Sequence, residues 1–149
     1  MLFRSRFKGG LVQAGPRPGS HEVIEAARKL GLTVALATNP VVSLAVDKVR
    51  MTWGELDPSG FADVSHIGNA RRTKPNALYF EEFAAQLGCA ASECLMVGND
   101  AGSDFPRPSI GMPVAYVGHG RPKKGVFRGS LIELASRLPE LIATLDARA

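Results

Sequence analysis

The sequence predicts an α/β fold, an open and mostly parallel Rossmann-like sheet with helices on both faces. Three short apolar runs have the composition of buried strands, and helical periodicities of about a dozen residues lie between them. Strands that alternate with helices indicate a parallel sheet, because parallel neighbours need a crossover connection. The chain has 149 residues, which is the size of one domain.

The first half of the chain is predicted to hold two helices and two strands. Ser20 is a suitable N-cap for a helix that ends at Gly31. The continuous apolar run 32–37 (LTVALA) predicts a strand covered on both faces. Apolar residues at helical spacing over 42–53 predict the second helix, and 61–67 (FADVSHI) indicates a short strand.

The second half continues the alternation. A helix is predicted over 75–88, followed by strands at 94–98 (CLMVG) and 113–118 (PVAYVG). The final helix covers 130–145, and we expect Pro139 to break or kink it, because proline removes a backbone donor and clashes with the preceding turn.

Composition argues against several classes of protein. The formal charge is +4, but the basic clusters lack interleaved aromatic residues and any known nucleic-acid module, so a solvated surface is favoured over nucleic-acid binding. No apolar stretch approaches the roughly 20 residues that cross a bilayer. The basic N-terminus has no apolar signal region, so we expect a cytoplasmic protein without membrane contact.

The two cysteines suggest neither a metal site nor a disulfide framework. Cys89 and Cys94 lie five positions apart, which matches neither a CxxC knuckle nor the pattern of a secreted disulfide-rich domain. We expect both thiols to be reduced and buried or half-buried.

Polar residues follow the predicted strands at the points where these end. Thr38 and Asn39 follow the first strand, Asp100 follows the strand at 94–98, and Asp104 comes one helical turn later. Lys74 lies at a junction between a loop and a helix. In a doubly wound sheet, ligands bind beyond the carboxyl ends of the strands, so these side chains are expected at one rim.

A hydroxyl, an ammonium and two carboxylates on one rim suit phosphoryl transfer. The Thr38 hydroxyl can donate to phosphate oxygens, Lys74 can neutralise charge on them, and Asp100 can hold Mg²⁺. Each residue alone has a plainer interpretation, as a turn former, a surface lysine or a helix cap. The functional interpretation gains weight because all of them occur in order at successive strand ends.

Three motifs resemble those of the haloacid dehalogenase-like hydrolase superfamily. They are VALATNP, which contains Thr38, KPNALYF, which begins with Lys74, and CLMVGNDAGSD, which contains Asp100 and Asp104. The resemblance covers about residues 15–135. A receiver domain of two-component signalling also combines acids, a threonine and a Lys-Pro pair, but it places its acids first, so it is a weak alternative.

The resemblance implies a role for each residue of the rim. Thr38 and Asn39 would bind the transferred phosphoryl group, and Lys74 would stabilise that group and the nucleophile. Asp100 would be a Mg²⁺ ligand, and Asp104 would complete the metal site or support Lys74. Members of the family act mostly as Mg²⁺-dependent phosphatases on small phosphorylated metabolites, and some are dehalogenases or mutases.

The first motif of the family, a DxDxT that carries the nucleophilic aspartate, is missing upstream of Thr38. The first aspartate in the chain is Asp47, inside a predicted helix. We therefore expect this chain to be inactive, either as a truncated hydrolase or as a natural pseudoenzyme that binds phosphate or Mg²⁺ without catalysis.

The expected organisation is an irregular N-terminal segment, 1–15, and a partial core domain, 16–149, without the first strand and the cap. Residues 2–5 (LFRS) match the translation of CTC TTC CGA TCT, the end of a common sequencing adapter, so the opening residues are a candidate artefact. In this family the first strand lies between the strands that end at Thr38 and Gly98. Without it, two strand edges are expected to be unpaired, which predicts marginal stability and self-association.

Overall fold

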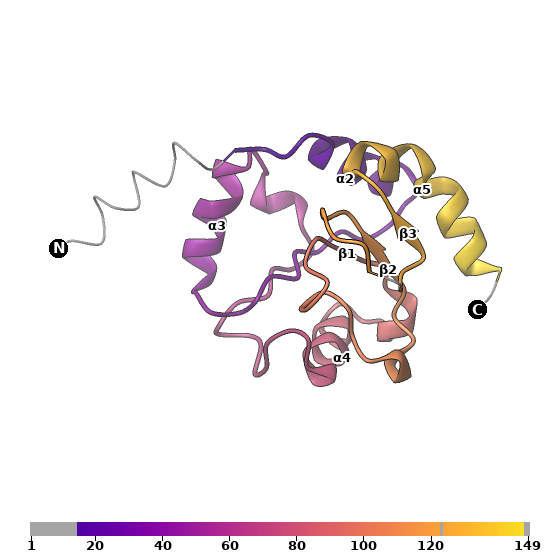
Figure 1. Ribbon diagram of the computed structural model, residues 1–149. Coiled ribbons are helices and arrows are strands. Elements are labelled where there is room, and N and C mark those ends of the chain that lie inside the picture. Colours follow the sequence, from indigo (N-terminus) through magenta and orange to yellow (C-terminus); the bar gives the residue numbers. More distant parts are fainter. Residues whose placement is uncertain (1–14, 123, 148–149) are drawn as a thin grey trace.

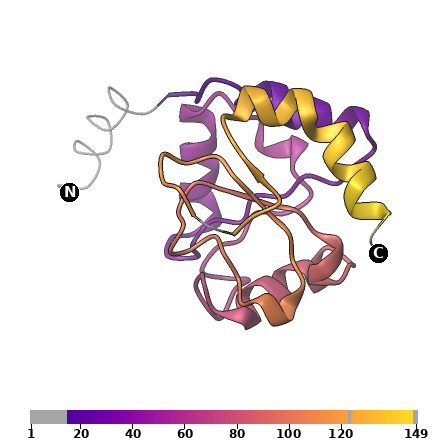
Figure 2. The same cartoon turned by 45° about the vertical axis from the view of Figure 1, so that its right-hand side comes forward.

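The computed structural model describes residues 15–122 and 124–147. Short parallel strands lie at the centre, with helices on both sides (Figure 1). Helices α2 (Ser20–Lys29) and α5 (Leu131–Asp146) lie together on one side of the strands, and α4 (Ala77–Gln86) lies on the other, as Figure 2 also shows. The predicted fold class is confirmed. Apart from residue 15, the predicted irregular segment 1–15 lies outside the described residues.

The main sheet has three strands in the order β1-β2-β3, and all its pairs are parallel. They are β1 (Met96–Gly98), β2 (Val114–Tyr116) and β3 (Phe127–Arg128). Two of them lie inside the predicted runs 94–98 and 113–118. Strand β3 was not predicted, because two residues are too short to show an alternating pattern.

The predicted strand at 32–37 forms only an isolated parallel bridge, between Leu36 and Val64. The backbone of Ala62 donates to Val34, and that of Ser65 donates to Leu36. The opposite edge of this segment, which faces β1, is unpaired. In the part of the chain that the structure describes, no backbone hydrogen bond joins residues 32–38 to β1. The prediction of a strand covered on both faces is therefore wrong, because only Leu36 pairs as a strand residue and none of the residues 32–37 is fully buried. The unpaired edge towards β1 agrees with the expectation of a missing first strand. Self-association through such an edge stays a prediction.

Helix α3 (Leu44–Trp53) follows this segment and agrees with the second predicted helix. The predicted strand at 61–67 contributes only Val64 to the bridge. Short 3₁₀ turns occupy Pro58–Gly60, Ala91–Glu93 and Pro108–Ile110. Among the described helices, none combines the length and the apolar character that a membrane span requires.

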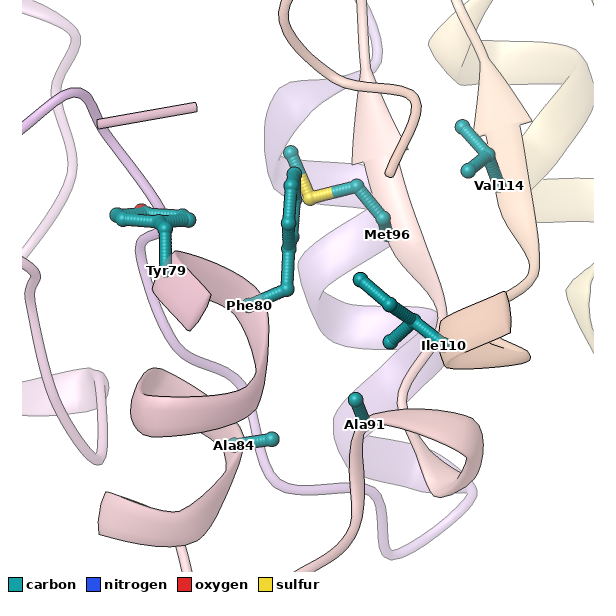
Figure 3. Packing of buried hydrophobic residues seen from close by; sticks show 7 residues of the cluster. All are labelled: Tyr79, Phe80, Ala84, Ala91, Met96, Ile110 and Val114. Carbon is teal, nitrogen blue, oxygen red and sulfur yellow. The ribbon is translucent and has the colours of Figure 1, made fainter. Parts of the chain in front are cut away.

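One core cluster fills the space between α4 and the strands (Figure 3). Tyr79 and Phe80 extend from α4, and Phe80 lies beside Met96 of β1. The rings of Tyr79 and Phe80 meet edge to face, with centroids 5.2 Å apart. Because these side chains pack against β1, they hold the start of α4 beside the carboxyl end of this strand.

A second core cluster lies between the sheet and the pair of helices α2 and α5. Its fully buried members are Ala115 of β2 with Leu134 and Leu138 of α5. Val23 and Ala27 of α2 pack against them. These contacts explain why α5 continues through Pro139, since the buried residues on this face outweigh the loss of one backbone donor. The predicted break is therefore wrong, and a kink at Pro139 stays a prediction.

Helix α2 begins one residue away from the predicted cap. Its N-cap is Gly19, with a φ of 88°, and Ser20 is the first helical residue. A Cβ on Gly19 would lie 2.5 Å from the backbone nitrogen of Ile132. The prediction of Ser20 as N-cap is wrong because the close approach of α5 requires a glycine there.

Replacing Leu134 with alanine should destabilise the protein by about 3 kcal/mol, because its side chain is fully buried in the second cluster. The matched control is Ile132→Ala on the same helix, where the side chain is 54% exposed and the loss should stay below about 1 kcal/mol. Urea denaturation would measure both. Equal losses would show that α5 does not pack as described.

Candidate active site

The predicted site residues come from three loops that meet around the carboxyl end of β1. Asp100 and Asp104 belong to the loop after β1, Lys74 lies just before α4, and Thr38 and Asn39 follow the bridged segment 32–37. Hydrogen bonds between these loops show which of the residues are in contact.

Lys74 and Asp104 form a buried ion pair. The Lys74 Nζ atom lies 2.5 Å from Oδ1 of Asp104, and the two side chains are 10% and 4% exposed. The second carboxylate oxygen, Oδ2, accepts the backbone N–H groups of Asn99 and Asp100, each at 2.9 Å. Both oxygens of Asp104 are thus engaged by the protein, which compensates for the burial of its charge.

Gly98 allows Asp104 to take this position. A Cβ on residue 98 would overlap the Asp104 side chain, which folds back over the end of β1. The last residue of the strand is therefore restricted to glycine by the carboxylate that covers it.

Asp100 presents an exposed carboxylate beside this pair. Its Oδ1 accepts the backbone N–H of Gly102 and its Oδ2 accepts the Ser103 hydroxyl, both at 2.8 Å. These hydrogen bonds, the one from Gly102 first, lower the pKa of Asp100, and the positive charge of Lys74 contributes less. Asp100 is therefore an ionised carboxylate open to solvent.

Asn39 connects the bridged segment to Lys74. Its side-chain Oδ1 accepts the backbone N–H of Lys74 at 2.9 Å. The same lysine holds Asp104 through its ammonium group, so Asn39, Lys74 and Asp104 form a continuous polar chain across the rim.

Thr38 is held through its backbone. Its carbonyl accepts hydrogen bonds from the Ser65 hydroxyl at 2.6 Å and from the Tyr79 hydroxyl at 2.8 Å. Within the described residues, the Thr38 side-chain hydroxyl has no hydrogen-bond partner, so it is available to a ligand.

Tyr79 and Ser65 were not among the predicted site residues, but their hydroxyl groups hold the Thr38 carbonyl in place. Their hydroxyl groups are 2.9 Å apart, and the residues are 1% and 0% exposed. Burial raises the pKa of Tyr79 to about 12; the Ser65 hydrogen bond opposes this shift and the Asp104 charge adds to it. One signal in the sequence could have indicated Tyr79, since it lies next to the apolar face of a predicted helix. A tyrosine buried there needs a hydrogen-bond partner for its hydroxyl group.

A single exposed carboxylate fits Mg²⁺, which is commonly held by one or two carboxylates, several waters and a substrate phosphate. Asp100 meets this requirement. Asp104 has both oxygens engaged, so the geometry favours its predicted role in supporting Lys74, and its direct binding of a metal stays a prediction. The described residues contain no cluster of three or more His, Cys, Asp or Glu that could hold a metal ion by itself, so waters and the substrate phosphate would have to supply the other ligands.

An open hollow of about 630 Å³ lies next to Lys74. Leu78 and Phe105 contribute apolar surface to it, and Arg107 contributes a second cation. The hollow offers space for a small molecule beside the ion pair.

The match to known families agrees with this geometry. Residues 8–106 match the family model of haloacid dehalogenase-like hydrolases. The chain therefore belongs to this family, as its three motifs indicated. A comparison with curated proteins gave no match.

Solved structures share the fold at low sequence identity. A HAD phosphatase from Thermococcus onnurineus is 21% identical, with a TM-score of 0.69 over 82% of this chain and 57% of that one. A β-phosphoglucomutase from Clostridium difficile is 16% identical, with a TM-score of 0.70 over 87% of this chain and 57% of that one. An uncharacterized protein from Listeria monocytogenes serotype 4b is 19% identical, with a TM-score of 0.66 over 88% and 81%. These identities show the fold alone, and the chain spans less than two thirds of the first two proteins.

Replacing Asp104 with asparagine should cost about 3 kcal/mol of stability, because it leaves the Lys74 ammonium without a counter-charge in a buried position. The matched control is Asp100→Asn in the same loop. Because this carboxylate is exposed, the free energy of unfolding should change little. Urea denaturation at neutral pH would compare the two variants. A larger loss for the Asp100 variant would contradict the described roles.

Tyr79 should make the protein lose stability in alkaline solution. Tyrosines of an unfolded chain ionise near pH 10, whereas the pKa of Tyr79 in the folded protein is about 12. Its contribution is therefore fully present below about pH 10 and is lost as the pH rises towards 12.

The Tyr79→Phe variant should lose about 1 kcal/mol at pH 7 through its missing hydrogen bonds. It should then lose less stability than the wild type between about pH 10 and pH 12. Urea midpoints of the two proteins, measured across this pH range, would test whether the wild type loses more stability. If the midpoints of both proteins fall in parallel with pH, ionisation of the Tyr79 hydroxyl is not the cause of the loss.

Proposed function

We propose that this chain is the phosphate-binding and Mg²⁺-binding core of a phosphatase that acts on a small phosphorylated metabolite. The observation that carries the proposal is the buried Lys74–Asp104 pair with the exposed carboxylate of Asp100 beside it. Membership of a hydrolase family supports the reaction class. The fold shared with a HAD phosphatase is compatible with it.

Lys74 is suited to bind phosphate while it stays paired. An ammonium group has three donors, and one of them is directed to Asp104. The other two can donate to phosphoryl oxygens, and the Thr38 hydroxyl can add a further donor. Because Asp104 fixes the side chain in advance, little conformational freedom is lost when the ligand binds.

Asp100 would hold Mg²⁺ at the edge of this pocket. The bound cation would supply positive charge to neutralise the phosphoryl oxygens. The hydrogen bonds from Gly102 and Ser103 keep the carboxylate ionised and oriented for this role.

The chain by itself is proposed not to complete the reaction. Asp47, the first aspartate of the sequence, is 2% exposed on α3, and its Oδ1 atom is 3.1 Å from Arg50. A buried, paired carboxylate does not serve as an attacking nucleophile at the rim. Phosphatase activity is therefore assigned to a protein that also holds the DxDxT strand of the family.

A non-catalytic binding or regulatory protein on the same scaffold is the alternative. The lack of an aspartate before Asp47 favours this alternative, because a binding protein needs no nucleophile. The two functions are distinguished by joining this chain to a strand that carries DxDxT. Restored hydrolysis of a phosphate ester would support the phosphatase, whereas binding without hydrolysis would support the alternative.

Inorganic phosphate should bind more tightly when Mg²⁺ is present, as measured by isothermal titration calorimetry. Lys74→Gln should weaken phosphate binding about tenfold, because it removes a charged donor. Asp100→Asn should abolish the effect of Mg²⁺ and leave binding without Mg²⁺ nearly unchanged. The control is Lys48→Ala, an exposed lysine on α3. If all four proteins bind phosphate equally, the proposed site is wrong.

Hydrolysis of p-nitrophenyl phosphate with Mg²⁺ tests the missing nucleophile. The 149-residue chain should show no more turnover than its Asp100→Ala variant. Turnover that disappears in this variant would contradict the proposed inactivity of the chain.

A further inference from the structure

Cys89 and Cys94 lie close together, away from the residues of the candidate site. Their Sγ atoms are 3.4 Å apart, and both are free, half-buried thiols. Cys89 follows the end of α4, and Cys94 lies two residues before β1. The 3₁₀ turn Ala91–Glu93 returns the chain between them and sets this proximity.

We propose that Cys89 and Cys94 form a redox-modification site, at which a low-molecular-weight disulfide converts the two thiols to an intramolecular disulfide. The proposal is independent of the proposed phosphatase function. A disulfide requires the sulfurs to approach to about 2.05 Å. Because Ala91 anchors the intervening turn in the first core cluster, this approach is assigned to rotation of the two half-buried cysteine side chains rather than to movement of the turn.

The reaction is a two-electron thiol–disulfide exchange. The Cys89 thiolate attacks one sulfur of the small disulfide, whose S–S bond breaks and releases one small thiolate. Cys94 then attacks the Cys89 sulfur of the mixed disulfide, and the second small thiolate leaves with the proton of Cys94. Two protein thiols are oxidised, and one small disulfide is reduced to two thiols.

The surroundings of the two sulfurs suggest this order of attack. Burial raises the pKa of Cys94 to about 12, and the hydrogen bond with Cys89 and the negative charge of Glu93 add to the effect. Cys94 therefore stays protonated near neutral pH, which makes it a poor first nucleophile. Cys89 is assigned the first attack and Cys94 the resolving step.

The new bond would tie the end of α4 to the start of β1. Both cysteines pack against the first core cluster, which already holds these two elements together. The folded arrangement should therefore favour the disulfide, and the disulfide should in turn raise the melting temperature by a few degrees, about the effect of closing a short loop.

The test is equilibration of the full chain with reduced and oxidised glutathione, in native buffer and in concentrated urea. Intact mass should show the loss of two hydrogens without a covalent dimer, and dithiothreitol should reverse it. The equilibrium constant for the disulfide should be at least about tenfold larger in the native protein than in urea, because the fold holds the sulfurs together.

Two variants test the assignment of the sulfurs. Cys94→Ser should stop at a glutathione mixed disulfide on Cys89. A control with Cys94→Ser and Ser136→Cys keeps two thiols but moves the second one to an exposed position on α5, on the other side of the strands from α4 (Figure 1). It should lose the tenfold preference. Equal constants in native buffer and urea, a disulfide-linked dimer, or glutathione on both cysteines of the wild type would each overturn the proposal.

Discussion

The polar chain from Asn39 through Lys74 to Asp104 connects two parts of the molecule that the sheet does not join. The backbone of Lys74 is bound by the Asn39 side chain, and its ammonium is bound by Asp104. Asn39 follows the bridged segment 32–37, whereas Asp104 covers the end of β1. Because no backbone hydrogen bonds between the described residues cross from 32–38 to β1, side chains carry this connection.

Tyr79 provides a second connection, one layer deeper. Its hydroxyl binds the Thr38 carbonyl, while its ring packs against Phe80 in the cluster that covers β1. Helix α4 and the residues just before it therefore hold the bridged segment at two points. Tyr79 binds the Thr38 carbonyl, and the backbone of Lys74 binds the Asn39 side chain. The residues that form the candidate site are also the ones that align the two strand ends, so stability and ligand binding depend on the same contacts.

The strand ends and their polar residues could be predicted because both signals are local. Apolar runs mark the strands, and Thr38, Lys74 and Asp100 follow them or their connections directly. What could not be predicted depends on approach between distant segments. Gly19 became the N-cap because α5 lies against it. The open edge of the segment 32–37 was expected from the missing first strand, but the reduction of its pairing to the single bridge between Leu36 and Val64 was not.

The partners of the site residues were hidden for the same reason. Asp104 could be predicted as an acid near Lys74, but its two bonds to the backbone of residues 99 and 100 depend on the missing side chain of Gly98. Ser65 and Tyr79 meet below Thr38 because two loops and a helix converge there. Long-range geometry of this kind leaves no periodic pattern in the sequence.

A double-mutant cycle on Lys74 and Asp104 tests the central claim most directly. The free energy of unfolding would be measured for the wild type, Lys74→Met, Asp104→Asn and the double variant. The two residues should couple by about 2 kcal/mol or more, because either single change leaves a buried charge without its partner. A coupling energy close to zero would show that the ion pair does not join the two parts of the molecule.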